Sequence, residues 1–89
     1  MKTRKGYSLR PLGMEFILVA DGLEAVDFSR MVSMNESAAL LWNAVEGKDF
    51  DVDTLVNLLV DNYDISRETA EHDADALLQT WRKANIIEE

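Results

Sequence analysis

Apolar residues change their spacing along this chain, from short continuous or alternating runs in the first third to a helical period afterwards. Residues 16–20, Phe-Ile-Leu-Val-Ala, form the most continuous early run. A short, partly β-branched run of this kind predicts the central strand of a sheet. A further strand is expected over residues 7–12, at a sheet edge because Pro11 has no N–H to donate to a ladder.

The residues that follow predict a turn and a third strand. Asp21-Gly22 is the dipeptide preferred in a two-residue type I′ hairpin turn. The chain is then expected to return through residues 25–28, with a bend at Ser29-Arg30. The third strand is therefore expected to be interrupted and to end in residues 31–34. From Asn35 onward the apolar residues take helical spacing.

Three amphipathic helices are predicted after the strands. Asn35 can cap the first helix, and Gly47 can adopt the left-handed conformation that ends it. Asp51 is a cap for the second helix and Ser66 for the third, which Asn85 can end. Each helix has an apolar stripe, made of Ala38, Leu41, Trp42 and Val45 in the first, Val52, Leu55, Val56, Leu59, Val60 and Tyr63 in the second, and Ala70, Ala74, Leu77, Leu78 and Trp81 in the third.

Strands that precede helices predict an α+β domain, with a small antiparallel three-stranded sheet followed by three helices in a winged-helix-like arrangement. We expect residues 1–6 to be a flexible N-terminus and residues 7–89 to be a single domain. The sequence has no cysteine and no apolar run near the roughly 18 residues of a membrane span. It also lacks the apolar stretch of a signal peptide, so we expect a cytoplasmic protein without a membrane partner.

Charge is distributed unevenly. Four of the nine basic residues, Lys2, Arg4, Lys5 and Arg10, precede all seventeen acidic residues, and the net charge is −8. The body of the domain is therefore acidic and repels nucleic acid and anionic surfaces. The second predicted helix contains no Lys or Arg, so it cannot neutralise phosphates as a DNA recognition helix must. We expect no nucleic-acid partner.

Catalytic chemistry has few candidate residues here. There is no cysteine, a single histidine and no glycine-rich phosphate loop. Glu68, His72 and Asp75 share one helical face and could hold a metal, but Glu71 and Asp73 flank the histidine, and a solvated charged face is favoured. No Asp-Ser-Leu occurs, which argues against an acyl carrier domain. The prediction is a protein without enzymatic activity, cofactor or metal.

The run from Met34 to Trp42, followed by Gly47, Tyr63-Asp64 and Asp73, resembles the PqqD family. This family is named for a protein of pyrroloquinoline quinone biosynthesis, and it includes the precursor-peptide recognition domains of ribosomally made, modified peptides. Residues 26–28, Val-Asp-Phe, resemble one branch of it. The likeness extends over residues 7–87, and its motifs are structural rather than catalytic.

The resemblance implies a winged-helix-like adaptor that binds the leader of a precursor peptide. The leader adds as a strand to the edge of the third strand, packs against the third helix, and is presented to a modifying enzyme, often a radical S-adenosylmethionine enzyme. Carried onto this chain, the peptide-binding residues are Phe28, Arg30, Met31, Val32, Ser33 and Met34 in the strand and Ala70, Asp73, Ala74, Leu77, Leu78 and Trp81 in the helix.

The residues themselves allow this mode of binding. Residues 31–34 contain no proline and no charge that would block pairing, and methionine adapts to varied partners. Ala70 and Ala74 would leave a groove beside Leu77. On composition alone, the same methionines and alanines favour ordinary core packing, and the family resemblance reverses this preference. A winged-helix transcriptional regulator and a subunit-assembly module without a peptide ligand are the alternatives.

Overall fold

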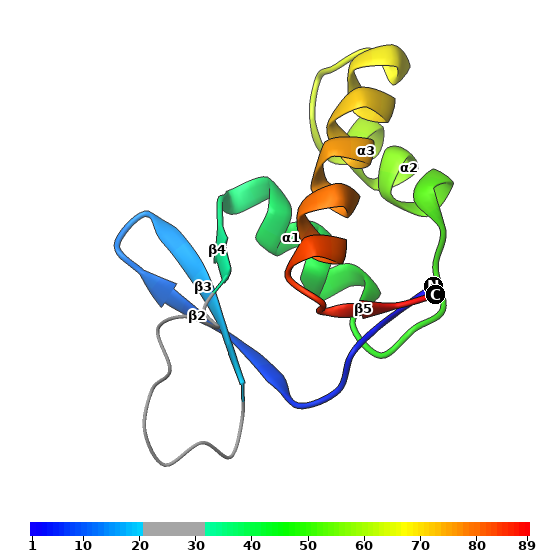
Figure 1. Cartoon of the computed structure of the whole chain (residues 1–89). Helices are drawn as coiled ribbons and strands as arrows, with labels where there is room; N and C mark the ends of the chain where they lie inside the picture. The colour runs from blue at the N-terminus through cyan, green and yellow to red at the C-terminus, as the bar shows by residue number, and fades with distance from the viewer. Residues whose placement is uncertain (21–31) are drawn as a thin grey trace.

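The computed structural model describes residues 1–20 and 32–89 of the chain. The turn predicted at Asp21-Gly22, the returning strand and the bend that follows it lie outside the described residues. The elements in order are β1 (Lys2–Thr3), β2 (Tyr7–Leu12), β3 (Glu15–Ala20), β4 (Val32–Met34), α1 (Glu36–Val45), α2 (Val52–Asn62), α3 (Arg67–Lys83) and β5 (Ile87–Glu88) (Figure 1).

The larger sheet is antiparallel, with the strand order β2-β3-β4. The predicted central strand is therefore confirmed, and β2, which contains Pro11, lies at an edge as expected. Gly13, at φ 64, and Met14 connect β2 to β3, and glycine suits the positive φ that the first central position of a type II′ turn needs. This hairpin projects away from the helices (Figure 1).

The joint between β4 and α1 connects the sheet to the helices. Phe16 and Leu18 of β3 pair with Met34 and Val32 of β4. Met34 is 2% exposed, and its neighbour Asn35 has an extended backbone and caps α1 by accepting a hydrogen bond of 2.9 Å from the N–H of Ala38. The predicted change from strand to capped helix at Asn35 is confirmed.

The other two predicted helix caps are also present. The carboxylate of Asp51 accepts a 2.9 Å hydrogen bond from the N–H of Thr54, whose hydroxyl oxygen accepts one from the Asp51 N–H, which completes a capping box. Ser66 caps α3. Arg67, in the first turn of α3, donates a 3.1 Å hydrogen bond to Asn57 of α2 and so links the two helices.

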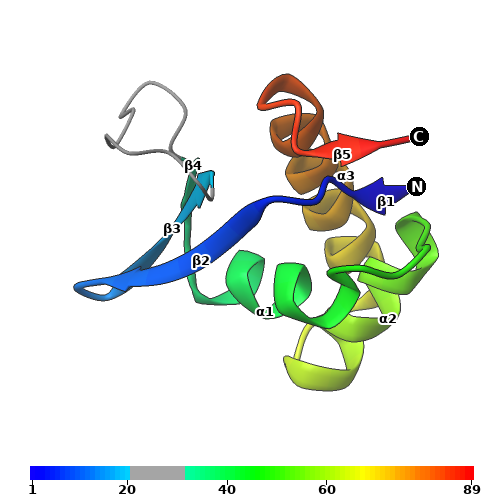
Figure 2. The same ribbon diagram turned by 90° about the horizontal axis from the view of Figure 1, so that it is seen from below.

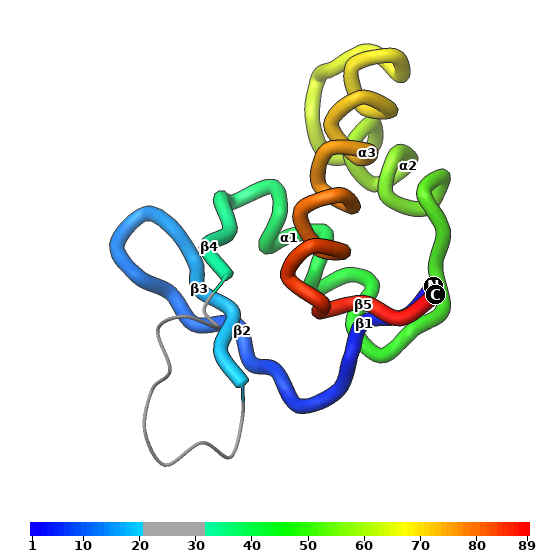
Figure 3. Tube along the Cα trace, viewed as in Figure 1, coloured from blue at the N-terminus to red at the C-terminus, as the bar shows by residue number. Residues whose placement is uncertain are grey.

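The two ends of the chain lie side by side, as Figures 2 and 3 show. Thr3 of β1 pairs with Ile87 of β5, and Thr3 Oγ1 accepts a 3.1 Å hydrogen bond from the N–H of Gly47 at the end of α1. Arg4 donates to Glu88 at 3.2 Å. The segment expected to be a flexible N-terminus thus contains a strand that pairs with the C-terminal strand β5 and is hydrogen-bonded to Gly47, just after α1.

The core lies where the inner face of the sheet meets the three helices, and α2 contributes Leu55, Val56 and Leu59 to it. Trp42 and Trp81 are fully buried and pack edge to face, with ring centroids 5.3 Å apart and planes at 88°. Phe50 packs against Trp81 in the same manner at 6.5 Å. Such edge-to-face aromatic pairs add stability beyond the area they bury. Within the described residues, no helix has both the length and the apolarity to cross a membrane.

Candidate functional site

β4 forms one edge of the larger sheet, and it is the strand that leads into α1. Among the described residues, β4 pairs only with β3, so the main-chain groups on its other edge bond to no strand there. An open edge of this kind is a template onto which another extended chain can pair. The chain continues from β4 through Asn35 directly into α1, so this edge lies close to the helices.

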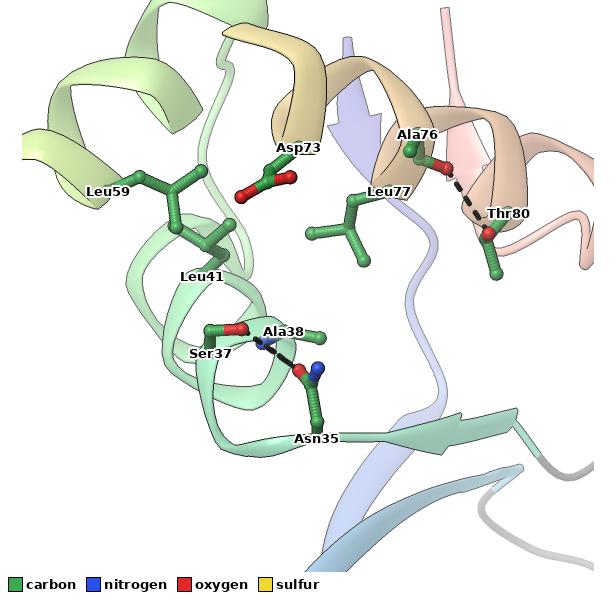
Figure 4. Close-up of a pocket in the computed structure, with 9 residues that line it drawn as sticks. All are labelled: Asn35, Ser37, Ala38, Leu41, Leu59, Asp73, Ala76, Leu77 and Thr80. Atoms are coloured by element: carbon green, nitrogen blue, oxygen red, sulfur yellow. Dashed lines mark hydrogen bonds between the residues drawn. The ribbon is translucent and has the colours of Figure 1, made fainter. Parts of the chain in front are cut away.

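A cavity of about 370 Å³ opens beside the end of β4, between α1 and α3 (Figure 4). Its size is within the range of ligand pockets, which extends from about 300 to 1,000 Å³. In Figure 4, Asn35 lies across the cavity from α3, and Leu77 points into it. The lining residues are Asn35, Ser37, Ala38, Leu41, Leu59, Asp73, Ala76, Leu77 and Thr80.

The wall of the cavity is apolar and its rim is polar. Leu41 and Leu59 are 1% and 4% exposed, and half-buried Leu77 adds an aliphatic side chain from α3. The exposed Asp73 side chain is the only charged one among the described lining residues. This arrangement suits a ligand with an apolar body and a polar group, because apolar walls supply affinity and a few polar groups fix orientation.

The structure separates the residues predicted on the third helix into two groups. Asp73 and Leu77 line the cavity. The other four are buried in the core, where exposures are 0 to 2%: Ala70, Ala74, Leu78 and Trp81. The row of α3 that faces the cavity is therefore 73, 76, 77 and 80, with helical spacing of three and four residues.

The residues predicted on the strand are only partly described. Phe28, Arg30 and Met31 lie outside the described residues. Of the others, Val32 is half-buried against the core, Ser33 is exposed, and Met34 is buried. Met34 therefore holds the strand to the core, and a ligand on this edge meets its main chain and its neighbours. The role of all twelve residues in peptide binding stays a prediction.

Several lining residues were not predicted as site residues, namely Asn35, Ser37, Ala38, Leu41, Leu59, Ala76 and Thr80. Asn35 was recognised as a helix cap, and Ala38, Leu41 and Leu59 were assigned to core-facing stripes. One signal was available for α3. Ala76, Leu77 and Thr80 follow Asp73 at three, four and seven residues, so a helix places them on the same side as Asp73.

The residues considered as metal ligands, Glu68, His72 and Asp75, all lie on α3. No cluster of three or more His, Cys, Asp or Glu side chains suited to a metal ion occurs within residues 1–20 and 32–89. Glu71, which flanks His72, pairs with Arg67 at 3.6 Å. The cavity is therefore suited to one side chain that has both an apolar and a polar part, next to the β4 edge.

A three-stranded antiparallel sheet followed by three helices, with a cavity beside an open strand edge, defines a winged-helix-like α+β domain. The model of the family described as Coenzyme PQQ synthesis protein D (PqqD) matches residues 3–87. The chain belongs to this family, so the resemblance based on the run from Met34 to Trp42 is confirmed. No curated protein matches the chain.

A solved structure shares the fold. It is that of TbiB1 in complex with the TbiA(beta) leader peptide, and it aligns with a TM-score of 0.71 and 18% sequence identity. The alignment covers 99% of this chain and 95% of that one. The same arrangement of sheet and helices is therefore reached with a largely different sequence.

Proposed function

We propose that this protein is a non-enzymatic adaptor that binds the leader of a ribosomally made precursor peptide. The leader adds as a strand to the open edge of β4, and one of its side chains enters the cavity between α1 and α3. The observation that carries the proposal is the position of this cavity at the end of the β4 edge, which pairs with no strand within residues 1–20 and 32–89. Main-chain bonds then give affinity, and the cavity gives specificity.

Two findings from the comparisons support this proposal. The chain belongs to the PqqD family over almost its whole length. The solved structure that shares its fold is itself a complex with a leader peptide. Neither finding identifies a peptide that this chain binds. The proposal for this chain is therefore based on the geometry of β4 and the cavity.

The charges favour a peptide ligand over duplex DNA. The exposed residues of α2 include Asp53 and Asp61 and no Lys or Arg. On α3, Arg67 and Arg82 are engaged with Glu71 and Glu89. A protein that reads DNA must first neutralise phosphates with free cations, and among the described ion pairs only Lys83, at the C-terminal end of α3, is left without a partner on these two helices.

The bound leader would be presented to a modifying enzyme, and a radical S-adenosylmethionine enzyme is the class that we propose first. This step places the adaptor in the cytoplasm, where precursor peptides are made and modified. The acidic body, with a net charge of −8, would attract a basic leader or a basic face of the enzyme. Such attraction raises the association rate and weakens as salt is added.

The test is a titration of the 15N-labelled protein with the leader peptide encoded beside its gene. We expect saturable amide shifts concentrated in β4 and in residues 73–80 of α3. Leu77→Ala should weaken binding because Leu77 lines the cavity, whereas Gln79→Ala, on an exposed position outside the cavity, should not. Shifts confined to other surfaces, or saturable binding to duplex DNA at physiological salt in place of the peptide, would refute the proposal.

A further inference from the structure

The polar groups around the cavity differ in how many hydrogen bonds they already make within the protein. Oδ1 of Asn35 accepts hydrogen bonds from the Ala38 N–H at 2.9 Å and from the Ser37 hydroxyl at 3.0 Å. The hydroxyl of Thr80 donates to the Ala76 carbonyl at 3.2 Å. These groups hold α1 and α3 in shape, as the dashed lines in Figure 4 show. Oδ1 of Asn35 already accepts two bonds, and the hydroxyls of Ser37 and Thr80 have already used their donor hydrogens.

The carboxylate of Asp73 is different. Among the described residues it has no hydrogen-bond or ion-pair partner, and it is the one charged side chain among the described residues that line the cavity. It stands one helical turn before Leu77, and in Figure 4 it lies above Leu41 and faces the cavity. The cavity thus presents a full negative charge with free acceptor sites over an aliphatic wall.

From this geometry we propose that the cavity binds a Lys or Arg side chain of the leader. The aliphatic stem would lie along Leu77 and Leu41, and the cationic head would reach the Asp73 carboxylate at the rim. Lys and Arg combine an apolar stem with a charged tip in this way, and both can donate several hydrogen bonds to a carboxylate. The inference rests on the proposed function, since it identifies the leader residue that enters the site.

The lining of the cavity disfavours a negatively charged leader residue. An acidic leader residue in the cavity would face Asp73 with no described cation among the lining residues to offset the repulsion. Asp73 is also exposed before binding, so its charge is hydrated and costs little to keep. When the leader covers the rim, water is displaced, and a charge-assisted hydrogen bond to Asp73 becomes stronger than an ordinary surface ion pair.

The experiment is a selection of mRNA-displayed random 14-residue peptides on the full chain. Wild type is compared with Asp73→Asn, Asp73→Lys and Asp75→Asn. Asp75→Asn is the matched control, because it removes the same charge from an exposed position of α3 that does not line the cavity. Circular dichroism of each variant verifies that the helices are retained, as expected for exposed positions.

We expect peptides selected by wild type and by Asp75→Asn to carry Lys or Arg at one fixed position. Asp73→Asn should lose this preference, and Asp73→Lys should replace it with Asp or Glu. In a synthetic selected peptide, norleucine in place of that Lys keeps the stem and removes the charge. It should weaken binding to wild type about 5- to 20-fold and leave binding to Asp73→Asn nearly unchanged.

The outcomes separate the two proposals. Selected peptides that bind β4 and α3 but show no basic preference, or one that persists in Asp73→Asn, would overturn this inference and leave the adaptor function standing. A wild-type selection that enriches no peptide would contradict the adaptor function, and this inference with it.

Discussion

Proline substitution in β4 tests strand addition most directly, because it removes one main-chain N–H from the proposed edge. In an antiparallel pair, successive residues direct their N–H and C=O groups alternately toward the partner strand and away from it. Val32 and Ser33 are neighbours in β4, and both are paired with β3. One of them therefore directs its N–H to β3 and the other to the open edge.

The two proline variants should behave differently. At the residue whose N–H points to the open edge, proline leaves the hydrogen bonds between β4 and β3 intact, as prolines in edge strands do. The free energy of unfolding should then fall by about 1 kcal/mol or less if the side chain is exposed. The incoming strand loses one donor and meets the proline ring, which should cost about 1–3 kcal/mol, a roughly 5- to 150-fold rise in Kd. At the other residue, proline breaks a ladder bond and lowers stability itself. Val32→Pro adds the loss of a half-buried side chain, whereas Ser33 is exposed.

The assay pairs thermal unfolding by circular dichroism with calorimetric titration of the leader peptide. Ser33→Ala is the control for Ser33→Pro, because it removes the side-chain hydroxyl and keeps the N–H. We expect one proline variant to stay folded with weakened binding, and Ser33→Ala to bind as wild type does. If both proline variants are folded and bind the peptide with unchanged Kd, the leader does not pair with β4, and the reasoning fails.

Three further predictions concern what holds the fold together. Thr3→Val leaves the Gly47 N–H without its buried acceptor and should cost about 1–3 kcal/mol, seen as a lower midpoint of thermal unfolding that Thr3→Ser does not show. Arg4→Ala removes the ion pair with Glu88, 3.2 Å long and partly exposed, and should cost about 0.5–1 kcal/mol, less when unfolding is measured at high salt. The hydrogen bond from the Thr54 N–H lowers the pKa of the Asp51 carboxyl below its ordinary value. Its stabilisation is therefore present above about pH 4 and is lost as pH falls through the lowered pKa. Asp51→Asn, which can still cap, should make the free energy of unfolding less dependent on pH in the acid range, as measured by urea titrations. An unchanged pH dependence would exclude this role.

Local signals predicted the helices well. The caps at Asn35, Asp51 and Ser66 depend on side chains that bond to N–H groups three residues later, so the sequence contains both partners within one turn. The position of Asn85 at φ 60 followed from the same kind of local rule, since asparagine tolerates the left-handed region. The central strand was recognised because its apolar run is short and continuous.

Long-range contacts were beyond such signals. Thr3 and Ile87 belong to two-residue strands at opposite ends of the chain, and no periodicity can be read from two residues. On α3, one broad apolar stripe contained both core and cavity positions. Ala74 is fully buried and Leu77 lines the cavity, and only the placement of α1 against α3 decides which side of the stripe is covered.

The joint at Asn35 connects the two parts of the proposed recognition. Asn35 ends the β4 edge, caps α1 and lines the cavity, while Met34 beside it is anchored in the core. The main chain of a bound leader and the side chain proposed to enter the cavity would therefore be positioned by the same core-anchored segment, which would lower the ordering cost of binding. A leader shifted by two residues along β4 would carry its side chain roughly 7 Å past the cavity. One well-placed side chain can thus set the register of the whole peptide.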